Sequence, residues 1–256
     1  MTVPVIEHIE LSALPGVRHA FFSREGGVST GIYRGLNVGR GSGDDPLAVA
    51  ENRRLAETHF GREEGDLLTC HQIHSAVVHV VDAPFGDARP EGDAVVTTQP
   101  GLICGALAAD CAPILFADAA ARVVGAAHAG WKGALGGVAE ATVAAMEAQG
   151  ADRRRLVAIV GPCIAQPSYE VGLEFEERFL SQDLHSAAFF AEGLSAERRQ
   201  FDLPGYVLSR LRRAQVAQCH WVGIDTCADE RYFSNRRAFH RGEPDYGRLL
   251  SAIMLV

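Results

Sequence analysis

Four apolar segments that follow one another along the chain constrain its fold more than any other feature. Each is rich in Val, Ile, Leu and Ala, and short turns separate them at residues 93–98, 102–109, 113–118 and 122–128. Because consecutive positions are apolar, the segments indicate strands that are covered on both faces of a sheet. The connections are too short to contain crossover helices, so they favour antiparallel neighbours over a parallel, doubly wound sheet.

The rest of the chain mixes further strands with helices. Strands are expected at 17–23, 66–71, 75–81, 155–160, 221–225 and 249–255, and helices at about 44–60, 130–150, 172–180 and 204–217. A glycine-rich segment at 24–43 predicts a long surface loop, or backbone that approaches a ligand closely. No repeat or linker divides the chain. We therefore predict one α+β domain over residues 1–256, with a buried, mostly antiparallel or mixed sheet system flanked by helices.

Charge and composition exclude several functional classes. The formal net charge of −8 provides no overall positive field for nucleic acid or an anionic membrane, although a local basic pocket for a small anion is compatible with it. The first residues lack the features of a signal peptide, and no apolar run is long enough to span a bilayer, so we expect a cytoplasmic protein. The six cysteines form no CxxC pair and are expected to be thiols, one of which can be a ligand or nucleophile. The sequence indicates no particular oligomeric state.

Polar residues interrupt the apolar strands at two places. His71 and His74 fall in the break between segments 66–71 and 75–81, and Asp110 and Cys111 precede segment 113–118. A buried aspartate needs a partner, so Asp110 is expected to orient a ligand or to bond the backbone. Ordinary roles fit the same pattern, since histidines occur in turns and a cysteine can be a small core residue.

The most informative stretch is residues 122–133. An apolar strand ends at His128, a turn of small residues follows, and a helix is expected to begin near Trp131. Helix starts favour anions, and Lys132, the single lysine of the chain, stands beside this one. Lys132 is therefore a candidate phosphate ligand, although a solvent-exposed lysine at a helix start is also common.

Two histidines and a cysteine together suggest a metal site. His74, Cys111 and His128 offer the nitrogen and sulfur atoms that zinc prefers, and three protein ligands leave a fourth position for water or substrate. Copper accepts the same atoms and remains an alternative. The gaps between the three residues are too long to be diagnostic by themselves.

Several ordered motifs extend from about Phe21 to the C-terminus. They are Phe22–Ser29 with Leu36 and Asn37, Glu51–Arg53, His71–Ser75, Gly92–Ala94, Ala109–Pro113, His128–Trp131, Gly161–Ile164, Tyr169–Gly172 and Phe233–Arg237. These motifs resemble the laccase-domain family, whose members are described as multicopper polyphenol oxidoreductases, purine nucleoside phosphorylases or peptidoglycan editing factors. The chain departs from the family pattern at 165–168, where members often have a glycine and a cysteine.

The resemblance implies a specific site and activity. The family's zinc ligands fall on His74, Cys111 and His128. Its activities are phosphorolysis of adenosine, inosine and methylthioadenosine, together with adenosine deamination, so the implied partners are a purine nucleoside and phosphate. The implied fold is similar to that of a bacterial toxin deamidase with a Cys–His site.

Other residues receive roles from these two reactions. Phosphorolysis requires phosphate to attack ribose C1′, and Lys132, Arg53 and Arg24 are candidate phosphate ligands. Asn37 is a candidate ligand of the ribose or base. For deamination, zinc would lower the pKa of bound water toward about 7, and Asp110 is a candidate for moving the proton.

Three alternative interpretations remain at this point. The first is a copper-dependent polyphenol oxidase (laccase). The second is a Cys–His hydrolase that edits peptidoglycan precursors, with Cys111 as nucleophile and a histidine as base. The third is a scaffold with a structural metal, for which Cys70, Cys104 or His71 would be the fourth ligand.

Overall fold

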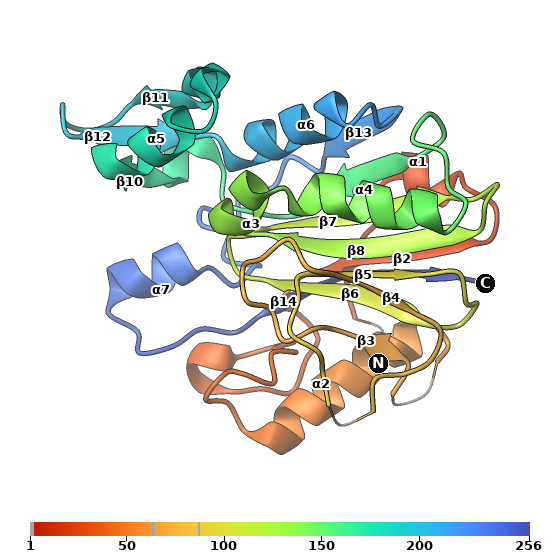
Figure 1. Ribbon diagram of the computed structural model, residues 1–256. Helices are drawn as coiled ribbons and strands as arrows, with labels where there is room; N and C mark the ends of the chain where they lie inside the picture. The colour runs from red at the N-terminus through yellow and green to blue at the C-terminus, as the bar shows by residue number, and fades with distance from the viewer. Residues whose placement is uncertain (1–2, 63–64, 87) are drawn as a thin grey trace.

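The computed structural model describes residues 3–62, 65–86 and 88–256. Two large sheets lie face to face, and helices cover their outer faces (Figure 1). The six-stranded sheet has the order β13-β9-β7-β8-β5-β4, with the bounds Gln218–Trp221, Val157–Val160, Ala112–Asp118, Val123–Ala129, Ala94–Thr97 and Val78–Val81. The five-stranded sheet has the order β1-β2-β14-β6-β3, with the bounds Val5–Ile6, Val17–Phe22, Leu249–Leu255, Ile103–Ala108 and Leu67–Leu68.

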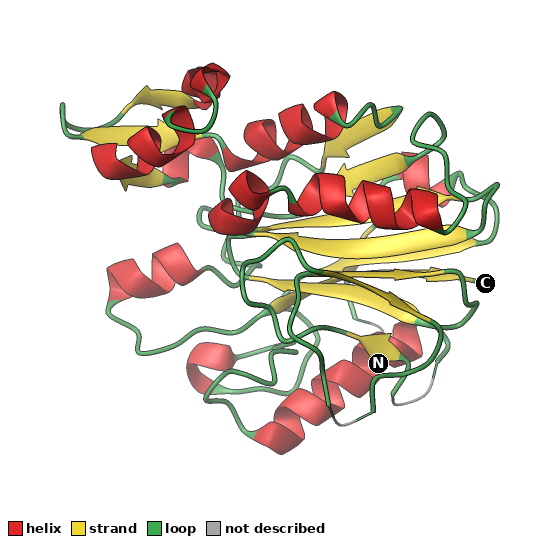
Figure 2. Ribbon diagram, viewed as in Figure 1, coloured by secondary structure: helices red, strands yellow, loops and turns green. Residues whose placement is uncertain are grey.

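Helices lie on opposite sides of this sandwich, as the colouring by secondary structure makes clear (Figure 2). Helices α3 (Trp131–Gly136), α4 (Val138–Ala148) and α6 (Leu203–Arg213) cover the six-stranded sheet. Helix α2 (Pro46–His59) lies on the outer side of the five-stranded sheet. The remaining helices are α1 (Ile9–Ser12), α5 (Leu173–Leu180) and α7 (Asn235–Arg241), with 3-10 turns η1 (Gly31–Tyr33), η2 (Gln166–Ser168) and η3 (Leu184–Phe189).

The alternation of side chains along each strand explains why both faces are apolar. Along β7, Ile114 and Phe116 pack in the core beneath α4 and α6, whereas Leu115 and Ala117 pack in the core between the two sheets. A third core lies between the five-stranded sheet and α2, where Leu55 packs in the same cluster as strand residues. Every face of the central strands is therefore buried, as the continuous apolar runs indicated.

The predicted α+β class with mixed sheets is confirmed. Most strand pairs are antiparallel, and the parallel pairs are β13 with β9, β3 with β6 and β4 with β5. The four central runs do not form one meander, however. Of these four strands, only β7 and β8 form a hairpin, because β6 belongs to the other sheet. The chain therefore crosses between the sheets before β6 and again after it. Asp110 and Cys111 lie at the second crossing.

Several elements differ from the sequence prediction. The helix expected at 130–150 is divided into α3 and α4 because Gly137 adopts a left-handed φ of 91°. The strand expected at 221–225 lies earlier, at β13. A small sheet of β10 (Glu170–Gly172), β12 (Arg198–Phe201) and β11 (Phe190–Glu192) was not predicted, nor was α7. In the described part of the chain, no helix combines the length and apolar character needed to cross a membrane.

Candidate metal centre

Three separate connections bring His74, Cys111 and His128 together. His74 lies in the loop between β3 and β4, Cys111 at the crossing from β6 to β7, and His128 near the end of β8. The hairpin register pairs Pro113 with His128, which places Cys111 beside the end of β8. One ligand atom from each of the three side chains lies within 4.8 Å of the others. The predicted convergence of these residues is therefore observed in the fold.

A buried carboxylate, Asp93, organises two of the three residues. Its Oδ1 accepts a hydrogen bond from Nδ1 of His128 at 2.9 Å and from the amide of His74 at 3.0 Å. Its Oδ2 accepts from the amide and the hydroxyl of Ser75 at 2.6 and 2.7 Å, and from the amide of Ile73 at 3.3 Å. These bonds hold His74 at a left-handed φ of 59°, which a non-glycine residue adopts only when its surroundings fix it.

The crossing that carries Cys111 is fixed by its neighbour Asp110. The Asp110 carboxylate accepts hydrogen bonds from the hydroxyl of Thr226 at 2.7 Å, the hydroxyl of Ser234 at 3.0 Å and the amide of Arg236 at 2.6 Å. Asp110 also has a left-handed φ, of 86°. Both oxygens thus bind protein donors, and the residue ties the β6–β7 crossing to the start of α7.

The charges around His128 favour a bound positive charge. Burial alone would lower the pKa of the His128 imidazole, but the adjacent Cys111 sulfur and the Asp93 carboxylate raise it to about 9. Burial raises the pKa of Asp93, yet the hydrogen bonds from His128 and Ser75 lower it to about 2, so this carboxylate is ionised. Burial and the charges of His128 and Lys132 lower the pKa of His74, which favours the neutral form that binds metals.

The shape of the site also fits a metal ion. Bond lengths of about 2.0–2.1 Å to nitrogen and 2.3 Å to sulfur place tetrahedral zinc ligands roughly 3.3–3.6 Å apart. The observed separations of up to 4.8 Å are close enough for small side-chain rotations to reach that arrangement. A Cβ at Gly130 would lie 2.5 Å from His74 Nδ1 and 2.9 Å from Cys111 Sγ, so this glycine keeps the space between the ligands open. His128 is oriented by Asp93 as metal-bound histidines usually are.

Two cavities adjoin this group of residues. One of about 330 Å³ contains His74, Cys111 and His128 together with Arg89 and Arg248. The other, of about 200 Å³, is lined by His74 and Cys111 but not by His128. Its wall combines Trp131, Ile164, Tyr169 and Leu203 with the charged residues Asp110 and Arg236. His74, Cys111, Ala109 and Asn235 line both cavities. The group is therefore open to one cavity with two arginines and to another with an aromatic wall.

Two of the predicted substrate ligands lie inside the scaffold. The Asn37 amide donates to Ser42 and Asp44, and its oxygen accepts from the amides of Gly39 and Arg248, so its hydrogen-bonding capacity is used within the protein. The Arg53 guanidinium is buried and donates to the carbonyl of Leu67 at 3.1 Å. Burial lowers the pKa of Arg53 to about 10. Neither residue lines the cavities beside His74, and their proposed roles stay predictions.

The other two predicted substrate ligands also line neither of the two cavities beside the centre. Lys132 is exposed at the start of α3, 5.5 Å from the centroid of the Trp131 ring, and its charge acts on His74. Arg24 lies over the ring of Phe233 at 4.3 Å and lines a different cavity. Lys132 is thus close enough for its charge to act on His74, whereas Arg24 lines a separate cavity, and the roles of both as substrate ligands stay predictions.

Sequence reasoning gave no role to several residues that shape the site. Asp93 resembles a polar residue at the start of a strand, and its position in a Gly92–Ala94 motif was the one available signal. Asn235 lies in the Phe233–Arg237 motif but received no role, and Arg89 comes from a segment with no regular pattern. Among residues 3–62, 65–86 and 88–256, the group of close ligand atoms contains His74, Cys111 and His128 without a fourth member. Cys70, Cys104 and His71 are therefore not part of it.

Comparison with known proteins identifies relatives over almost the full chain. A purine nucleoside phosphorylase of Deinococcus radiodurans is 39% identical over 238 residues, covering 93% of this chain and 90% of the relative. Purine nucleoside phosphorylase YfiH of Escherichia coli K12 is 35% identical over 247 residues, covering 94% and 95%. The crystal structure of Neisseria meningitidis protein NMB0706 has a TM-score of 0.88 at 32% identity and covers 100% of this chain and 99% of that one.

The family assignment rests on the whole sandwich and not on the site alone. Residues 18–256 match the family described as multi-copper polyphenol oxidoreductase laccase, which spans every strand from β2 to β14 and all three candidate ligands. With relatives of more than 30% identity along most of its length, the chain belongs to this laccase-like family.

Proposed function

We propose that this chain is a purine nucleoside phosphorylase that cleaves the N-glycosidic bond of adenosine, inosine or methylthioadenosine with phosphate, and that zinc at His74, Cys111 and His128 is its metal. Adenosine deamination is proposed as a second activity of the same centre. Relatives that cover most of the chain are named purine nucleoside phosphorylases, which supports the reaction class. Their names carry no information about the metal or about deamination.

One observation carries the proposal: two cavities adjoin the candidate metal centre, one lined by Arg89 and Arg248 and the other with an aromatic wall. Phosphorolysis must hold an anion and a planar purine on either side of ribose C1′ while positive charge develops on the sugar. Arg89 and Arg248 can bind phosphate through charged hydrogen bonds in the larger cavity. Trp131 and Tyr169 supply aromatic surface for the base in the smaller one. Asn235 lines both cavities and can donate a hydrogen bond to the sugar or the base.

The protein's own residues then have defined tasks. When bound, the metal would act as a Lewis acid that polarises an oxygen atom of a bound reactant. Asp93 holds the proton on Nδ1 of His128 and so keeps Nε2 free for the metal. Asp110 keeps Cys111 in place, and because its two oxygens already accept three hydrogen bonds we assign it a positioning role in place of proton transfer.

A second candidate function has specific geometric support. Cys111 lies beside His128, and His128 is oriented by Asp93 at 2.9 Å, which is the order of nucleophile, base and orienting carboxylate found in cysteine hydrolases. A hydrolase that acts on peptidoglycan precursors would use this arrangement without a metal. A multicopper oxidase fits less well, because it needs several copper centres and the residues described here provide one group of three ligands.

A nucleoside panel tests the proposal directly. The purified chain is incubated with adenosine, inosine and methylthioadenosine, with and without phosphate, and free base and ammonia are measured. We expect free base that appears only with phosphate, and loss of activity after chelation that added zinc restores. Free base released equally without phosphate would reject phosphorolysis. Activity that survives chelation but is abolished by thiol alkylation would favour the cysteine hydrolase.

A variant of Arg89 tests the proposed phosphate site independently of the candidate metal centre. Arg89→Ala is expected to raise the KM for phosphate by about tenfold and to change kcat less, since a charged hydrogen bond of the ground state is lost. Arg154→Ala is the matched control, because Arg154 is exposed and pairs with Asp152 in the turn before β9. Equal kinetic constants for the two variants would remove Arg89 from the proposed site.

A further inference from the structure

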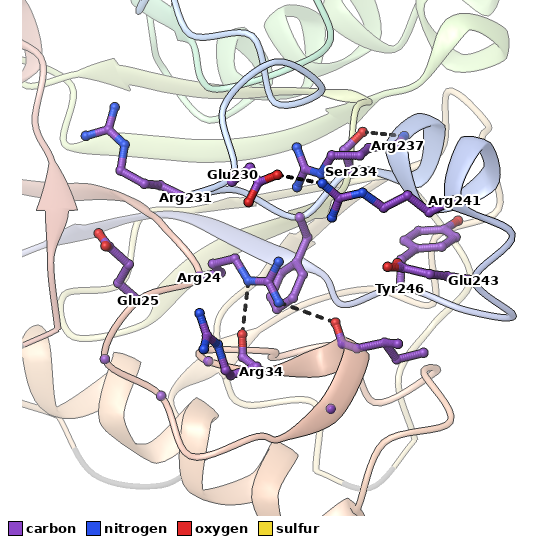
Figure 3. A pocket seen from close by; sticks show the side chains of 16 residues that line it. Arg24, Glu25, Arg34, Glu230, Arg231, Ser234, Arg237, Arg241, Glu243 and Tyr246 are labelled. Carbon is purple, nitrogen blue, oxygen red and sulfur yellow. Dashed lines mark hydrogen bonds and ion pairs between the residues drawn. The ribbon is translucent and has the colours of Figure 1, made fainter.

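A further cavity, distinct from the two beside the candidate metal centre, lies beside the glycine-rich loop; we call it the arginine cavity. It has a volume of about 630 Å³, and Tyr246 is the one residue that it shares with the larger cavity at the metal centre. Residues 24–35 form one wall and residues 230–246 form the other. Figure 3 shows Arg24 and Arg34 on one side and Arg237 and Arg241 on the other. The cavity thus lies apart from His74, Cys111 and His128.

The charge of the arginine cavity is opposite to that of the whole chain. The formal net charge of the protein is −8. The cavity, in contrast, is lined by five arginines (Arg24, Arg34, Arg231, Arg237 and Arg241) and three glutamates (Glu25, Glu230 and Glu243). Two of the arginines are used in ion pairs, Arg241 with Glu230 at 2.5 Å and Arg231 with Asp229 at 2.6 Å. The positive charge of the cavity therefore comes mainly from the other three.

Arg24 and Arg237 are held in place by the backbone and not by carboxylates. Arg24 donates to the carbonyls of Arg34 at 3.0 Å and Ile32 at 3.3 Å, and its guanidinium lies over the ring of Phe233. Arg237 donates to the carbonyls of residues 226, 227, 229 and 232. These neutral acceptors orient the two guanidinium groups without neutralising their charges, which nearby carboxylates offset only in part.

The arginines also repel one another. Burial lowers the pKa of Arg24, and the charges of Arg237 and Arg34 lower it further, while Glu243 and Glu230 offset part of the effect. Arg34 is exposed and forms no ion pair with any carboxylate in the described part of the chain. Like charges gathered in a partly buried cavity destabilise the free protein, and an anion that binds all of them relieves this repulsion.

From this arrangement we propose that the arginine cavity is a binding site for a small molecule that carries a phosphate or diphosphate group. Planar guanidinium groups held at fixed positions match phosphoryl oxygens through paired hydrogen bonds. The volume of about 630 Å³ exceeds that of a single phosphate, so the ligand extends beyond its anionic group. The site does not depend on the proposed phosphorolysis, because it contains none of His74, Cys111 and His128 and shares only Tyr246 with the larger cavity beside them.

Calorimetric titration with pyrophosphate tests the proposal. The titrations use the full-length chain and its Cys111→Ser/Arg89→Ala double variant, in which the candidate metal centre and the phosphate ligand proposed for the larger cavity are both removed. We expect saturable binding with equal affinity in both proteins, which keeps this result distinct from the fate of the proposed function. Arg34→Ala should weaken binding by about tenfold, and Arg34→Glu should abolish it.

The control is Arg154→Glu, which changes the net charge by the same amount at an exposed arginine outside the cavity. It should leave the affinity within about twofold of the wild-type value, because exposed charges are screened over about 8–10 Å. The proposal is overturned if pyrophosphate does not bind to the full-length chain, if Arg34→Glu binds it normally, or if Arg154→Glu weakens binding as much as Arg34→Glu does.

Discussion

Replacing Asp93 by asparagine tests how the candidate metal centre is held together. The substitution preserves the size of the side chain but turns one acceptor oxygen into an NH₂ donor. Both oxygens of Asp93 now accept from protein N–H or O–H groups, among them Nδ1 of His128 at 2.9 Å and the amide of Ser75 at 2.6 Å. Either orientation of the new amide therefore brings a donor against a donor.

The NH₂ group costs less at the position of Oδ1, where it faces His128 and one backbone amide, than at the position of Oδ2, where it faces two backbone amides. This orientation has a direct consequence for the metal. If the NH₂ group faces His128, the imidazole must accept at Nδ1 and carry its proton on Nε2, the nitrogen that is needed as a ligand. Loss of such an orienting carboxylate typically weakens metal affinity by about 10–100-fold. That range corresponds to about 1.4–2.7 kcal/mol of binding free energy. We expect Asp93→Asn to fall within it.

The assay is a zinc titration in competition with a chromophoric chelator, with thermal unfolding measured in parallel. Asp118→Asn is the matched control, because Asp118 is equally buried and also accepts backbone amides, from Ala121 and Asp152. It should lower stability without changing zinc affinity. A zinc affinity for folded Asp93→Asn within threefold of the wild-type value would refute the reasoning.

Three further predictions concern the scaffold of the site and the pH dependence of stability. Asp110→Asn should lower the free energy of unfolding by about 2–4 kcal/mol, measured in urea, because the buried carboxylate accepts three hydrogen bonds. Gly130→Ala should weaken zinc binding by roughly tenfold in the same competition titration while leaving the fold intact, since its Cβ would lie 2.5 Å from His74 Nδ1; unchanged affinity would contradict the close approach. Burial and the charge of His8 lower the pKa of His19 to about 4, and its Nε2 accepts from the His8 amide at 2.8 Å. The unfolded chain therefore binds the proton first, so His19 should lower stability as pH falls from about 6.5 to 4, by up to about 3 kcal/mol, and His19→Gln should remove that part of the pH dependence in unfolding experiments.

The strands could be predicted because burial on both faces leaves continuous apolar runs, and those runs coincide with β5, β6, β7 and β8. Burial on both faces also explains why the assignment of strands to sheets could not be predicted. A strand that is apolar on both faces gives no contrast between them, so the sequence does not show that β6 belongs to the second sheet. Helix α7 and the small sheet were missed for the opposite reason, since their short segments carry few buried residues and no clear period.

The three candidate ligands could be singled out because histidine and cysteine are unusual where apolar strands end, and because their motifs resemble those of the laccase-domain family; the structure brings their side chains together. Residues that act through them gave weaker signals. Asp93 functions through contacts made by its carboxylate in three dimensions, and nothing in its neighbours reveals them. Asn37 and Arg53 show the reverse case. They are predicted to bind substrate, and this stays a prediction; the structure shows that their polar atoms also have hydrogen-bond partners inside the scaffold, as buried polar groups need.

The central claim is that His74, Cys111 and His128 hold one metal ion with a position left for a reactant. X-ray absorption spectroscopy at the zinc edge, on protein with one equivalent of zinc, measures this coordination directly. We predict two histidine nitrogens at about 2.0–2.1 Å, one sulfur at about 2.3 Å and one further oxygen or nitrogen, with the sulfur contribution lost in Cys111→Ser. A spectrum without sulfur, or one with two or more sulfur ligands, would contradict the account.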